Sequence, residues 1–464
     1  MLKLFFLLFM GAGVPVAIAM AAASLAYILM AGNLPPFVVV HRMVSGIDSF
    51  PLLAVPFFIL AGNLMNNAGI TTRIYNFALA LVGWLKGGLG HVNVLGSVIF
   101  AGMSGTAIAD AAGLGTIEIK AMKEHGYATE FAVGVTAASA TLGPIIPPSL
   151  PFVIYGMMAN VSVGALFLAG ILPGALMAVL MMLTVAYFAH RHGWGADVKF
   201  SRTRLAKALT ELAVVIAWPL ALWLVVSRLG APPQASVLVG LASLFVLDRL
   251  FRFEALLPIM TPVLLIGGMT TGLFTPTEGA IAACVWAMIL GFAWYRTLRW
   301  RTFVKVCLDT VETTATVLFI VAAASIFGWM LTATGVTAEI AGWVLSFTRE
   351  AWVFLLMANL LMLFVGCFLE PTAAITILVP ILLPIATQLG VDPIHFGLVM
   401  VLNLMIGLLH PPMGMVLFVL ARVAGLSVER TTMAILPWLA PLLASLVAIT
   451  YLPRAVLWLP KMFF

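Results

Sequence analysis

The sequence predicts an all-α polytopic membrane protein made of two structural repeats, and three observations support this fold class. Hydrophobic residues make up 63% of the 464 residues and charged residues only 9%, whereas a soluble domain carries about 25% charged residues. Apolar stretches of about 18 residues or more, long enough to cross a ~30 Å hydrocarbon core, recur along the chain. Proline and glycine interrupt two of these stretches at corresponding places, TLGPIIPPSLPF (141–152) and IGLLHPPMGMVLF (406–418).

The apolar stretches are continuous, which favours membrane helices over the alternating strands of a β-barrel. The formal net charge of +6 does not indicate a nucleic-acid partner, because the basic residues are scattered among short loops. The three cysteines lack CxxC spacing and lie among apolar residues. They are therefore interpreted as packing residues, not as a disulfide framework or a metal cluster.

The apolar stretches predict the spans in chain order. Residues 4–30 could be a signal peptide, but the run is too long and many spans follow, so they are interpreted as the first transmembrane helix. The segment 256–295 is either one long span or two short ones. The other continuous candidates are 50–66, 71–86, 165–189, 210–227, 234–247, 311–331, 338–348 and 432–452, and the broken candidates are 131–158 and 394–421.

Two further segments are too short on either side of an interruption to cross a bilayer. In 91–126 the interruption is Met103–Thr106, and in 351–390 it lies around GCFLEPTAA (366–374). Apolar stretches of roughly 10–14 residues are typical of re-entrant segments. Both segments are predicted to be helical hairpins that enter the membrane and turn back.

One sequence offset relates the two halves of the chain. Gly102 and Gly366 differ by 264 positions, since 366 − 102 = 264. The same offset relates Gly143 to Gly407 and Pro147–Pro148 to Pro411–Pro412. An offset shared by a hairpin tip and a broken helix indicates duplication. The predicted domains are a first repeat over 1–190, a connecting region with extra helices over 191–255, and a second repeat over 256–464.

Duplicated units with helices broken at matching positions are typical of secondary transporters, which bind substrate and ions at the interruptions. An interior proline costs about 3 kcal/mol in an ordinary helix, and unsatisfied backbone groups in lipid cost several kcal/mol more. The breaks are therefore expected to face a cavity, an ion or the preceding hairpin. The chain contains no GxxxxGK[ST] motif, so ATP is not expected to be the energy source.

Loop charges predict which end of the molecule faces the cytoplasm. Basic residues flank the first hairpin and follow 165–189, which places both regions on the cytoplasmic side. These residues are Lys86, Lys120, Lys123, Arg191, Lys199, Arg202, Arg204 and Lys207. If the repeats are inverted, the second hairpin lies on the periplasmic side. The basic residues within 296–305 argue against this, and the repeat is given more weight than that single loop.

Motifs around both interruptions resemble the large membrane subunit of the tripartite ATP-independent periplasmic (TRAP) transporters. The similar segments cover most of the chain. They are SFPLLAVPFFILAGNLM (49–65), GMSGTAIADAAGLGTIEIKAMKEHGY (102–127), LGPIIPPS (142–149), GLFTPTEGA (272–280), GCFLEPTAAITILVPILLPIA (366–386) and GVDPIHFGLVMVLNLMIGL (390–408).

The resemblance implies a sodium-coupled importer of an organic acid, such as a C4-dicarboxylate or a sugar acid, in the bacterial inner membrane. It implies two partners, a small four-helix TRAP membrane subunit and a periplasmic substrate-binding protein. It also implies an elevator mechanism, in which a transport domain slides against a scaffold domain. Because the sequence begins with the first span of the large subunit, the small subunit is expected to be a separate chain.

Two features depart from the family pattern. Residues 209–250 are longer and more apolar than expected, and two extra short spans joined by GAPPQ (230–234) would preserve the topology. His410 stands where many members carry threonine, so a role of that hydroxyl does not transfer to this position. The imidazole either titrates near neutral pH or has its tautomer held by a backbone carbonyl.

Sodium is a hard cation that prefers oxygen ligands, which unwound carbonyls and half-helix C-termini supply in broken-helix transporters. The first Na+ site is expected between the first hairpin tip and the first break, at Ser104, Gly105, Thr106, Gly143 and Pro147. By the repeat, the second is expected at Gly366, Thr372, Gly407 and Pro411. The alternative for Ser104 and Thr106 is ordinary helix capping at the tip.

A carboxylate substrate is expected between the two tips. Half-helix N-termini near Ser149 and Met413 would offer N–H groups and a positive dipole end. The tips and breaks contain no arginine or lysine, so dipoles, hydroxyls and sodium ions would meet the substrate charge. The predicted substrate-binding residues are Ser104, Thr106, Ser149, His410 and Met413.

Acidic residues within a membrane are functional candidates, because inserting one unpaired costs about 2.5–3.5 kcal/mol. Those near the interruptions are Asp110, Glu118, Glu278 and Glu370. Asp110, Glu278 and Glu370 are predicted to be gates or ligands, with helix capping as the alternative for Glu278. Three asparagines in apolar spans are interpreted as interhelical hydrogen-bonding residues instead of ligands, namely Asn63, Asn93 and Asn403.

Two other functions fit parts of the pattern. An ion channel would conduct sodium without saturable, coupled substrate uptake. The GMSG segment has the GxSG form of intramembrane serine proteases, with Ser104 as nucleophile and His410 as a distant base candidate. A protease explains neither the repeat nor the proline breaks, so no enzyme activity is expected.

Overall fold

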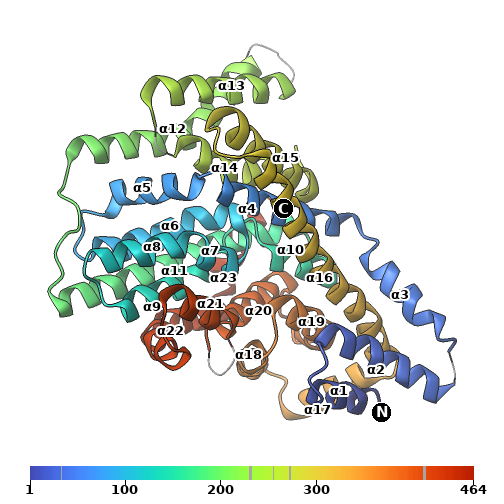
Figure 1. Ribbon diagram of the computed structural model, residues 1–464. Coiled ribbons are helices and arrows are strands. Elements are labelled where there is room, and N and C mark those ends of the chain that lie inside the picture. Colours follow the sequence, from blue (N-terminus) through green and yellow to red (C-terminus); the bar gives the residue numbers. More distant parts are fainter. Residues whose placement is uncertain (33, 229–232, 254, 271–272, 411–413, 464) are drawn as a thin grey trace.

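The computed structural model is built from helices (Figure 1) and describes residues 1–464 except 33, 229–232, 254, 271–272, 411–413 and 464. Those described ranges contain no β-strand, only an isolated backbone bridge between Lys86 and Ala196. Among the described residues, six helical segments are long and apolar enough to cross a bilayer, namely 50–67, 163–192, 276–294, 300–333, 371–388 and 428–451. The predicted all-α membrane class is confirmed.

The N-terminal segment differs from the prediction. In place of one span over 4–30, it forms two helices, α1 (Leu2–Gly11) and α2 (Val16–Ala31), which pack against each other. Gly13 has a φ of +78° between them, which breaks the helical path after α1. Pro15, which has no N–H, is the N-cap residue of α2. A third helix, α3 (Phe37–Ile47), was not predicted, and α2 and α3 both pack along α16 (Trp300–Ala333).

The first half continues as predicted. The span at 50–66 is η1 (Phe50–Leu53) followed by α4 (Ala54–Asn67). The predicted span 71–86 is the shorter helix α5 (Ile70–Val82), which is not among the six segments long enough to cross a bilayer. The first hairpin consists of α6 (Gly88–Ser104), α7 (Ala107–Ala112) and α8 (Leu114–Glu124). The broken helix consists of α9 (Thr129–Ala140) and α10 (Leu150–Ala159), and the long span α11 (Val163–His192) follows.

The connecting region contains two helices, α12 (Arg202–Arg228) and α13 (Pro233–Phe251). The turn between them lies largely outside the described residues. The ambiguous segment 256–295 is two elements, α14 (Leu256–Thr270) and α15 (Pro276–Met288), the latter extended by the π-helical turn η2 (Ile289–Trp294). Thr275 and Glu278 form a capping box at the start of α15, which explains why a new helix begins there.

The second half repeats the order of hairpin and broken helix. After α16 come α17 (Val336–Phe347), the hairpin arms α18 (Ala351–Gly366) and α19 (Pro371–Gln388), and the broken helix α20 (Pro393–Gly407) and α21 (Met415–Ala424). The chain ends with α22 (Val428–Tyr451), α23 (Pro453–Leu457) and α24 (Pro460–Phe463).

The bases of the two hairpins lie at opposite ends of the helical bundle. Near the base of the first hairpin, Lys123 Nζ donates to the carbonyl of Ala424, just before α22 begins (2.8 Å). Helix α22 has 24 residues and is therefore about 36 Å long. At its far end, Tyr451 Oη donates to the carbonyl of Trp352, at the base of the second hairpin (3.4 Å). The two hairpins therefore enter from opposite ends.

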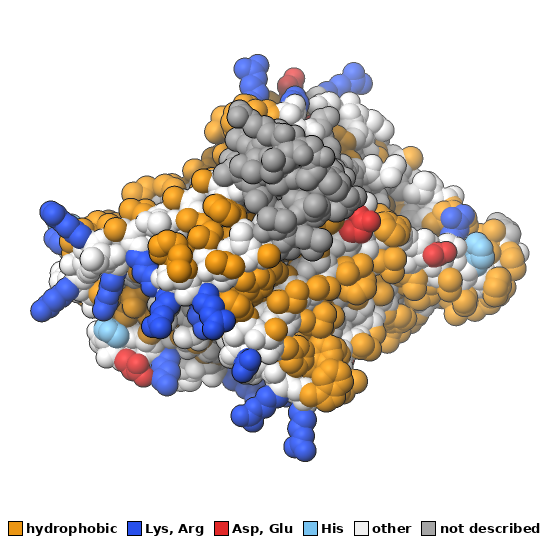
Figure 2. Space-filling model, turned by 90° about the horizontal axis from the view of Figure 1, so that it is seen from above, with side chains coloured by type: hydrophobic (Ala, Val, Ile, Leu, Met, Phe, Trp, Pro, Cys, Tyr) orange, Lys and Arg blue, Asp and Glu red, His pale blue; other side chains and the backbone are white. Residues whose placement is uncertain are grey.

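The outer surface is apolar where a membrane would cover it. Apolar side chains spread over much of the face in Figure 2, and Lys and Arg project near its edges. Large apolar side chains such as Leu7, Trp343 and Phe364 are about two-thirds exposed (66%, 65% and 66%). Such a surface is stable against lipid tails and not against water, which agrees with a polytopic membrane protein.

Glycines allow several helices to pack at close range, as is common in membrane bundles. A Cβ atom on Gly134 of α9 would lie 2.6 Å from the indole Nε1 of Trp438 of α22. A Cβ on Gly397 of α20 would collide with the ring of Tyr155 of α10. The Tyr155 ring is also held in place, because its hydroxyl donates to the carbonyl of Pro393 (2.6 Å).

We predict that Gly397→Ala destabilises the protein, because the methyl group must displace the fixed Tyr155 ring; overpacking of this kind costs about 1–3 kcal/mol. The thermal unfolding midpoint of the purified protein in detergent should fall. Gly342→Ala is the control, since a Cβ there meets no atom within 4 Å. An unchanged midpoint for Gly397→Ala would contradict the tight α10–α20 contact.

Candidate functional site

The tip of the first hairpin lies against the first break. Gly105 has a φ of +65°, and its carbonyl accepts a hydrogen bond from the N–H of Leu150, the first residue of α10 (3.4 Å). A Cβ atom on Gly105 would lie 2.7 Å from the carbonyl oxygen of Pro148. Both the positive φ and the close approach require glycine, so the tip and the break meet backbone to backbone.

A second glycine tightens the same contact. A Cβ on Gly143, in the break, would lie 3.0 Å from the carbonyl oxygen of Thr106 at the tip. The Thr106 side chain accepts a hydrogen bond from the N–H of Ala109 and caps α7 (3.2 Å). The predicted residues Gly105, Thr106 and Gly143 therefore lie together. The Thr106 hydroxyl caps a helix, as the alternative interpretation of this residue proposed.

Ser149 holds the break together from within. Its hydroxyl donates to the carbonyl of Pro144 (2.5 Å) and accepts from the N–H of Phe152 (3.2 Å), which caps α10. The side chain is fully buried. Its only hydrogen is used inside the break, a role that the sequence pattern did not indicate.

Ser104 differs from the other hydroxyls at this tip. Its side chain is 5% exposed, and Oγ has no hydrogen-bond partner among the described residues. Gly62 of α4 packs against it so closely that a Cβ there would lie 3.2 Å from the Ser104 carbonyl oxygen. A buried hydroxyl without a partner is costly, so this oxygen is available to a ligand.

The second tip also lies close to the second break. A Cβ on Gly407 would lie 2.7 Å from both the Cα and the carbonyl carbon of Gly366, and a Cβ on Gly366 would lie 3.2 Å from Cα of Gly407. At the same place, Cys367 Sγ lies 3.4 Å from His410 Nδ1. The predicted residues Gly366, Gly407 and His410 are thus adjacent, whereas Pro411 and Met413 lie outside the described residues.

Glu370 and Thr372 lie at the start of α19. The Glu370 carboxylate accepts hydrogen bonds from the Thr372 hydroxyl (2.9 Å) and the Ala373 N–H (3.3 Å), so it caps the helix. It therefore occupies the position that Thr106 holds at the first tip. The two tips share their backbone contact but carry different capping groups.

The other two predicted acidic residues lie in different surroundings. The Glu278 carboxylate accepts hydrogen bonds from the N–H and the hydroxyl of Thr275 (2.8 Å each). These bonds cap the start of α15, which was the alternative role considered for Glu278. Asp110 lies in α7, four residues beyond the first tip, and is 1% exposed. One of its carboxylate oxygens has no partner among the described residues.

The helix that follows each break packs against the hairpin of the other half of the chain. Helix α10, which follows the first break, packs along α19 of the second hairpin. Helix α21, which follows the second break, packs along α7 of the first hairpin. The four elements that carry the tips and breaks therefore form one unit.

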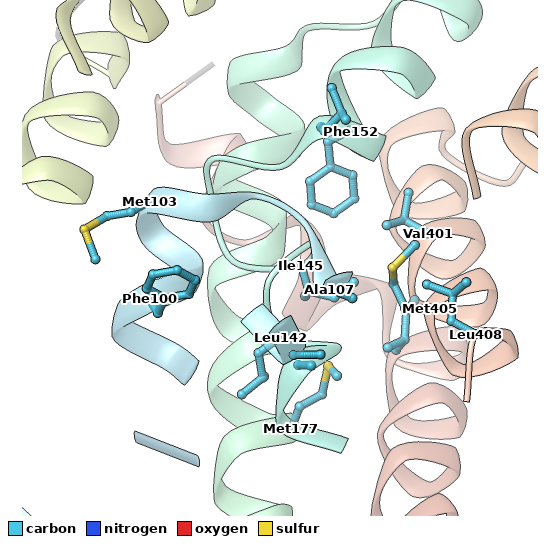
Figure 3. Close-up of a cluster of buried hydrophobic side chains, with 14 of the residues drawn as sticks. Phe100, Met103, Ala107, Leu142, Ile145, Phe152, Met177, Val401, Met405 and Leu408 are labelled. Atoms are coloured by element: carbon cyan, nitrogen blue, oxygen red, sulfur yellow. The ribbon is translucent and has the colours of Figure 1, made fainter. Parts of the chain in front are cut away.

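An apolar cluster fills the space beside the first tip and break (Figure 3). Its labelled members include Phe100 and Met103 of α6, Leu142 and Ile145 of the break, and Val401 and Met405 of α20. All six are buried. This cluster keeps water from the tip and strengthens electrostatic interactions there.

Buried amides tie each hairpin to its broken helix. Ser139 Oγ donates to Asn93 Oδ1 in the first half (2.7 Å), and Asn403 donates to Asn359 Oδ1 in the second half (2.7 Å). Asn63 likewise donates to Thr310 (3.2 Å). All three predicted asparagines make interhelical hydrogen bonds. Ser139 was not among the predicted residues, although it stands 264 positions before Asn403 (403 − 139 = 264).

Comparison with known proteins assigns this architecture to a family. The family model of the tripartite ATP-independent periplasmic transporter, DctM component, matches residues 3–455. The chain is 40% identical to the sialic acid TRAP transporter large permease protein of Vibrio cholerae, over 97% of this chain and 96% of that protein. It is 36% identical to the C4-dicarboxylate TRAP transporter large permease protein of Pseudomonas aeruginosa, over 89% and 87% of the two chains.

Solved structures share the fold at low sequence identity. The Alcanivorax borkumensis YdaH transporter superposes with a TM-score of 0.58 at 14% identity, over 89% of this chain and 87% of that one. Neisseria gonorrhoeae MtrF, described as one of a class of antimetabolite efflux pumps, gives 0.57 at 12% identity, over 89% and 83%. These likenesses concern the fold alone.

The family match removes the protease alternative, because GMSG is explained as a hairpin tip packed on a proline break and the family consists of transporter permeases. The apolar spans agree with a multi-pass location in the bacterial inner membrane. The chain belongs to the DctM family, the large permease components of tripartite ATP-independent periplasmic transporters.

Proposed function

We propose that this permease imports an organic acid into the cytoplasm together with sodium ions. The names of its relatives support the substrate class, because sialic acid, C4-dicarboxylates and 2,3-diketo-L-gulonate are all carboxylic acids or their derivatives. The observation that carries the site is the buried Ser104 hydroxyl, which has no hydrogen-bond partner in the described part of the chain and lies at the first hairpin tip. Oxygen atoms from a hydroxyl and carbonyls are the ligands that hard cations prefer.

The first sodium ion would bind between the first tip and the first break. Ser104 Oγ would coordinate it, with carbonyl oxygens of the tip and of the break around Gly143 and Pro147. Thr106 would contribute through its backbone, since its side chain caps α7. The second ion would bind where Gly366 meets Gly407, with Thr372 as a further candidate ligand; the predicted ligand Pro411 lies outside the described residues.

The acid would bind between the two tips. It would lie near the N-terminal ends of α10 and α21, whose dipoles favour a negative charge. His410 would contribute through its imidazole, next to Cys367. Because the tips and breaks lack arginine and lysine, affinity for the acid would depend on the bound sodium ions, and that dependence would couple the two solutes.

Two further subunits would complete the transporter. A small four-helix membrane subunit would hold the scaffold, and a periplasmic substrate-binding protein would deliver the acid. The unit made of hairpins and broken helices would move as the transport domain of an elevator. Asp110, in α7 just beyond the first tip, and Glu370, at the second tip, would act as gates.

The membrane potential would contribute to accumulation. Two sodium ions moving with a monovalent acid carry a net charge of +1, and one charge moved through 100 mV is worth about 2.3 kcal/mol. At about 1.4 kcal/mol per tenfold, voltage alone would support roughly fifty-fold accumulation. The sodium gradient would add to this.

We expect proteoliposomes that contain both membrane subunits to take up a labelled acid only with sodium outside and the binding protein present. Sialic acid, succinate and 2,3-diketo-L-gulonate are the first acids to test, each with the binding protein encoded beside the permease. Equal uptake in choline buffer would refute sodium coupling. Sodium flux without saturable acid uptake would instead identify a channel.

Ser104→Ala should raise the sodium concentration that gives half-maximal uptake by about tenfold, the effect of losing roughly 1.4 kcal/mol of ion binding. The matched control is Ser445→Ala, since Ser445 is also buried but donates to the carbonyl of Pro441 within α22 (2.9 Å). If both variants keep the sodium dependence of the wild type, the first sodium site is misassigned.

Gly407→Ala should lower the uptake rate about tenfold or more, because its methyl group collides with the Gly366 backbone and forces the second tip away from the break. The control is Gly328→Ala, whose Cβ would make only ordinary contacts with Pro380 (3.4 and 3.6 Å). Full activity of Gly407→Ala would show that transport tolerates an opened second tip.

A further inference from the structure

A cavity of about 390 Å³ lies between α5 and the start of α12, away from the tips and breaks. One wall is apolar and comes from α5, with Phe77, Leu79 and Ala80, and from Ala208 of α12. The loop residue Trp84 also lines it, with its ring set edge-on to Phe200 at 5.2 Å. The cavity is thus amphipathic, because most of its remaining lining is polar or charged.

The charged lining is positive. It contains Lys199, Arg204, Lys207 and Glu211, three cations and one carboxylate, for a net charge of +2 (3 − 1 = 2). The Glu211 carboxylate accepts the N–H of Ala255 (2.5 Å), and Lys207 Nζ donates to the carbonyl of Arg252 (2.6 Å). Among the described residues, no acidic side chain forms an ion pair with Lys199 or Arg204.

The first turn of α12 adds to this positive field. Ser201 precedes α12 and accepts the N–H of Arg204 (3.4 Å), while it also lines the cavity. The N-terminal end of a helix of 27 residues favours negative charge. The cations are therefore reinforced by a helix dipole at the same mouth.

The cavity lies at the end of the molecule where basic loops meet. The loop before α6 pairs with the loop before α12 through Lys86 and Ala196, and Leu89 N–H donates to Asp197 (2.8 Å). In Figure 2 many of the Lys and Arg side chains lie on the left side of the face, and a few others lie at its top, bottom and right. By the positive-inside rule this end faces the cytoplasm, where the adjacent leaflet carries the anionic lipids.

We infer that this cavity binds a phosphate group, with Lys199, Arg204 and the α12 N-terminus around the phosphate oxygens. The apolar α5 wall and Trp84 fit the glycerol and first acyl carbons of an anionic phospholipid. A free phosphate compound in the cytoplasm carries the same group and would use the same cations. The site links α5, α12 and the loop between α11 and α12, so its occupation stabilises the packing of α12 on α5.

The test is lipid binding by the purified permease in detergent, measured by native mass spectrometry. Phosphatidylglycerol and phosphatidylcholine with identical acyl chains are titrated in parallel. The double variant Lys199→Gln/Arg204→Gln should bind phosphatidylglycerol roughly twenty-five-fold more weakly, about fivefold for each charge removed. The control Arg202→Gln/Arg301→Gln removes the same charge from exposed positions outside the lining and should keep the affinity of the wild type.

The outcomes separate the two sources of phosphate. Preference for phosphatidylglycerol that is lost only in the cavity variant assigns the site to a lipid. Thermal stabilisation by inorganic phosphate that is lost only in the cavity variant assigns it to a free phosphate. Equal binding of both lipids without phosphate stabilisation, or equal losses in both double variants, overturns the inference. Should the double variant fail to fold, Arg204→Gln alone is compared with Arg202→Gln.

Discussion

The structure depends on one constraint, which is that main-chain polar groups released by a broken helix inside a membrane must find partners there. Lipid offers none. In the first half the tip of the preceding hairpin supplies one such partner, and in the second half the preceding tip lies against the start of the break. Gly105 accepts from Leu150 in the first half, and Gly366 lies against Gly407 in the second. Neither contact leaves room for a side chain, so glycine at the tips follows from the proline breaks.

Side chains then cap the free N–H groups at the starts of the helices that follow the tips and the first break. Thr106 caps α7 and Ser149 caps α10 while it also bridges its own break. Glu370 caps α19. Unlike the hydroxyls of Thr106 and Ser149, the Ser104 hydroxyl at the first tip has no hydrogen-bond partner among the residues that the structure describes. The Ser104 hydroxyl therefore remains able to coordinate a ligand, whereas the capping groups already make hydrogen bonds within the protein.

The distribution of charged side chains distinguishes the two candidate binding regions of the molecule. The tips and breaks contain no lysine or arginine, and an apolar cluster surrounds the first of them. Lys199, Arg204 and Lys207 lie instead at the cavity between α5 and the start of α12, away from the tips and breaks. Anionic groups of two kinds would therefore be recognised by two kinds of chemistry, helix dipoles with bound cations at the centre and lysine and arginine at the membrane surface.

The amino-acid sequence by itself determined the membrane class, the two hairpins, the two broken helices and the offset between halves. These features depend on local composition, namely the length of an apolar run and the presence of glycine and proline within it. Local composition predicted helix boundaries less accurately where a short glycine or proline interruption can either stay within one helix or divide it into two. Gly13 and Pro15 divide the predicted first span into α1 and α2, and α3 was missed because its apolar run is short.

Only the tertiary structure decided what each polar residue does. The sequence could place Ser104, Thr106, Ser149 and Glu370 at tips and breaks, but whether a hydroxyl or carboxylate caps a helix or stays unpartnered depends on which N–H groups come within about 3 Å of it. The cavity between α5 and α12 is of the same kind, because its lining comes from segments more than 100 residues apart (199 − 84 = 115). Distances between such segments are set by packing, and no local pattern in the chain encodes them.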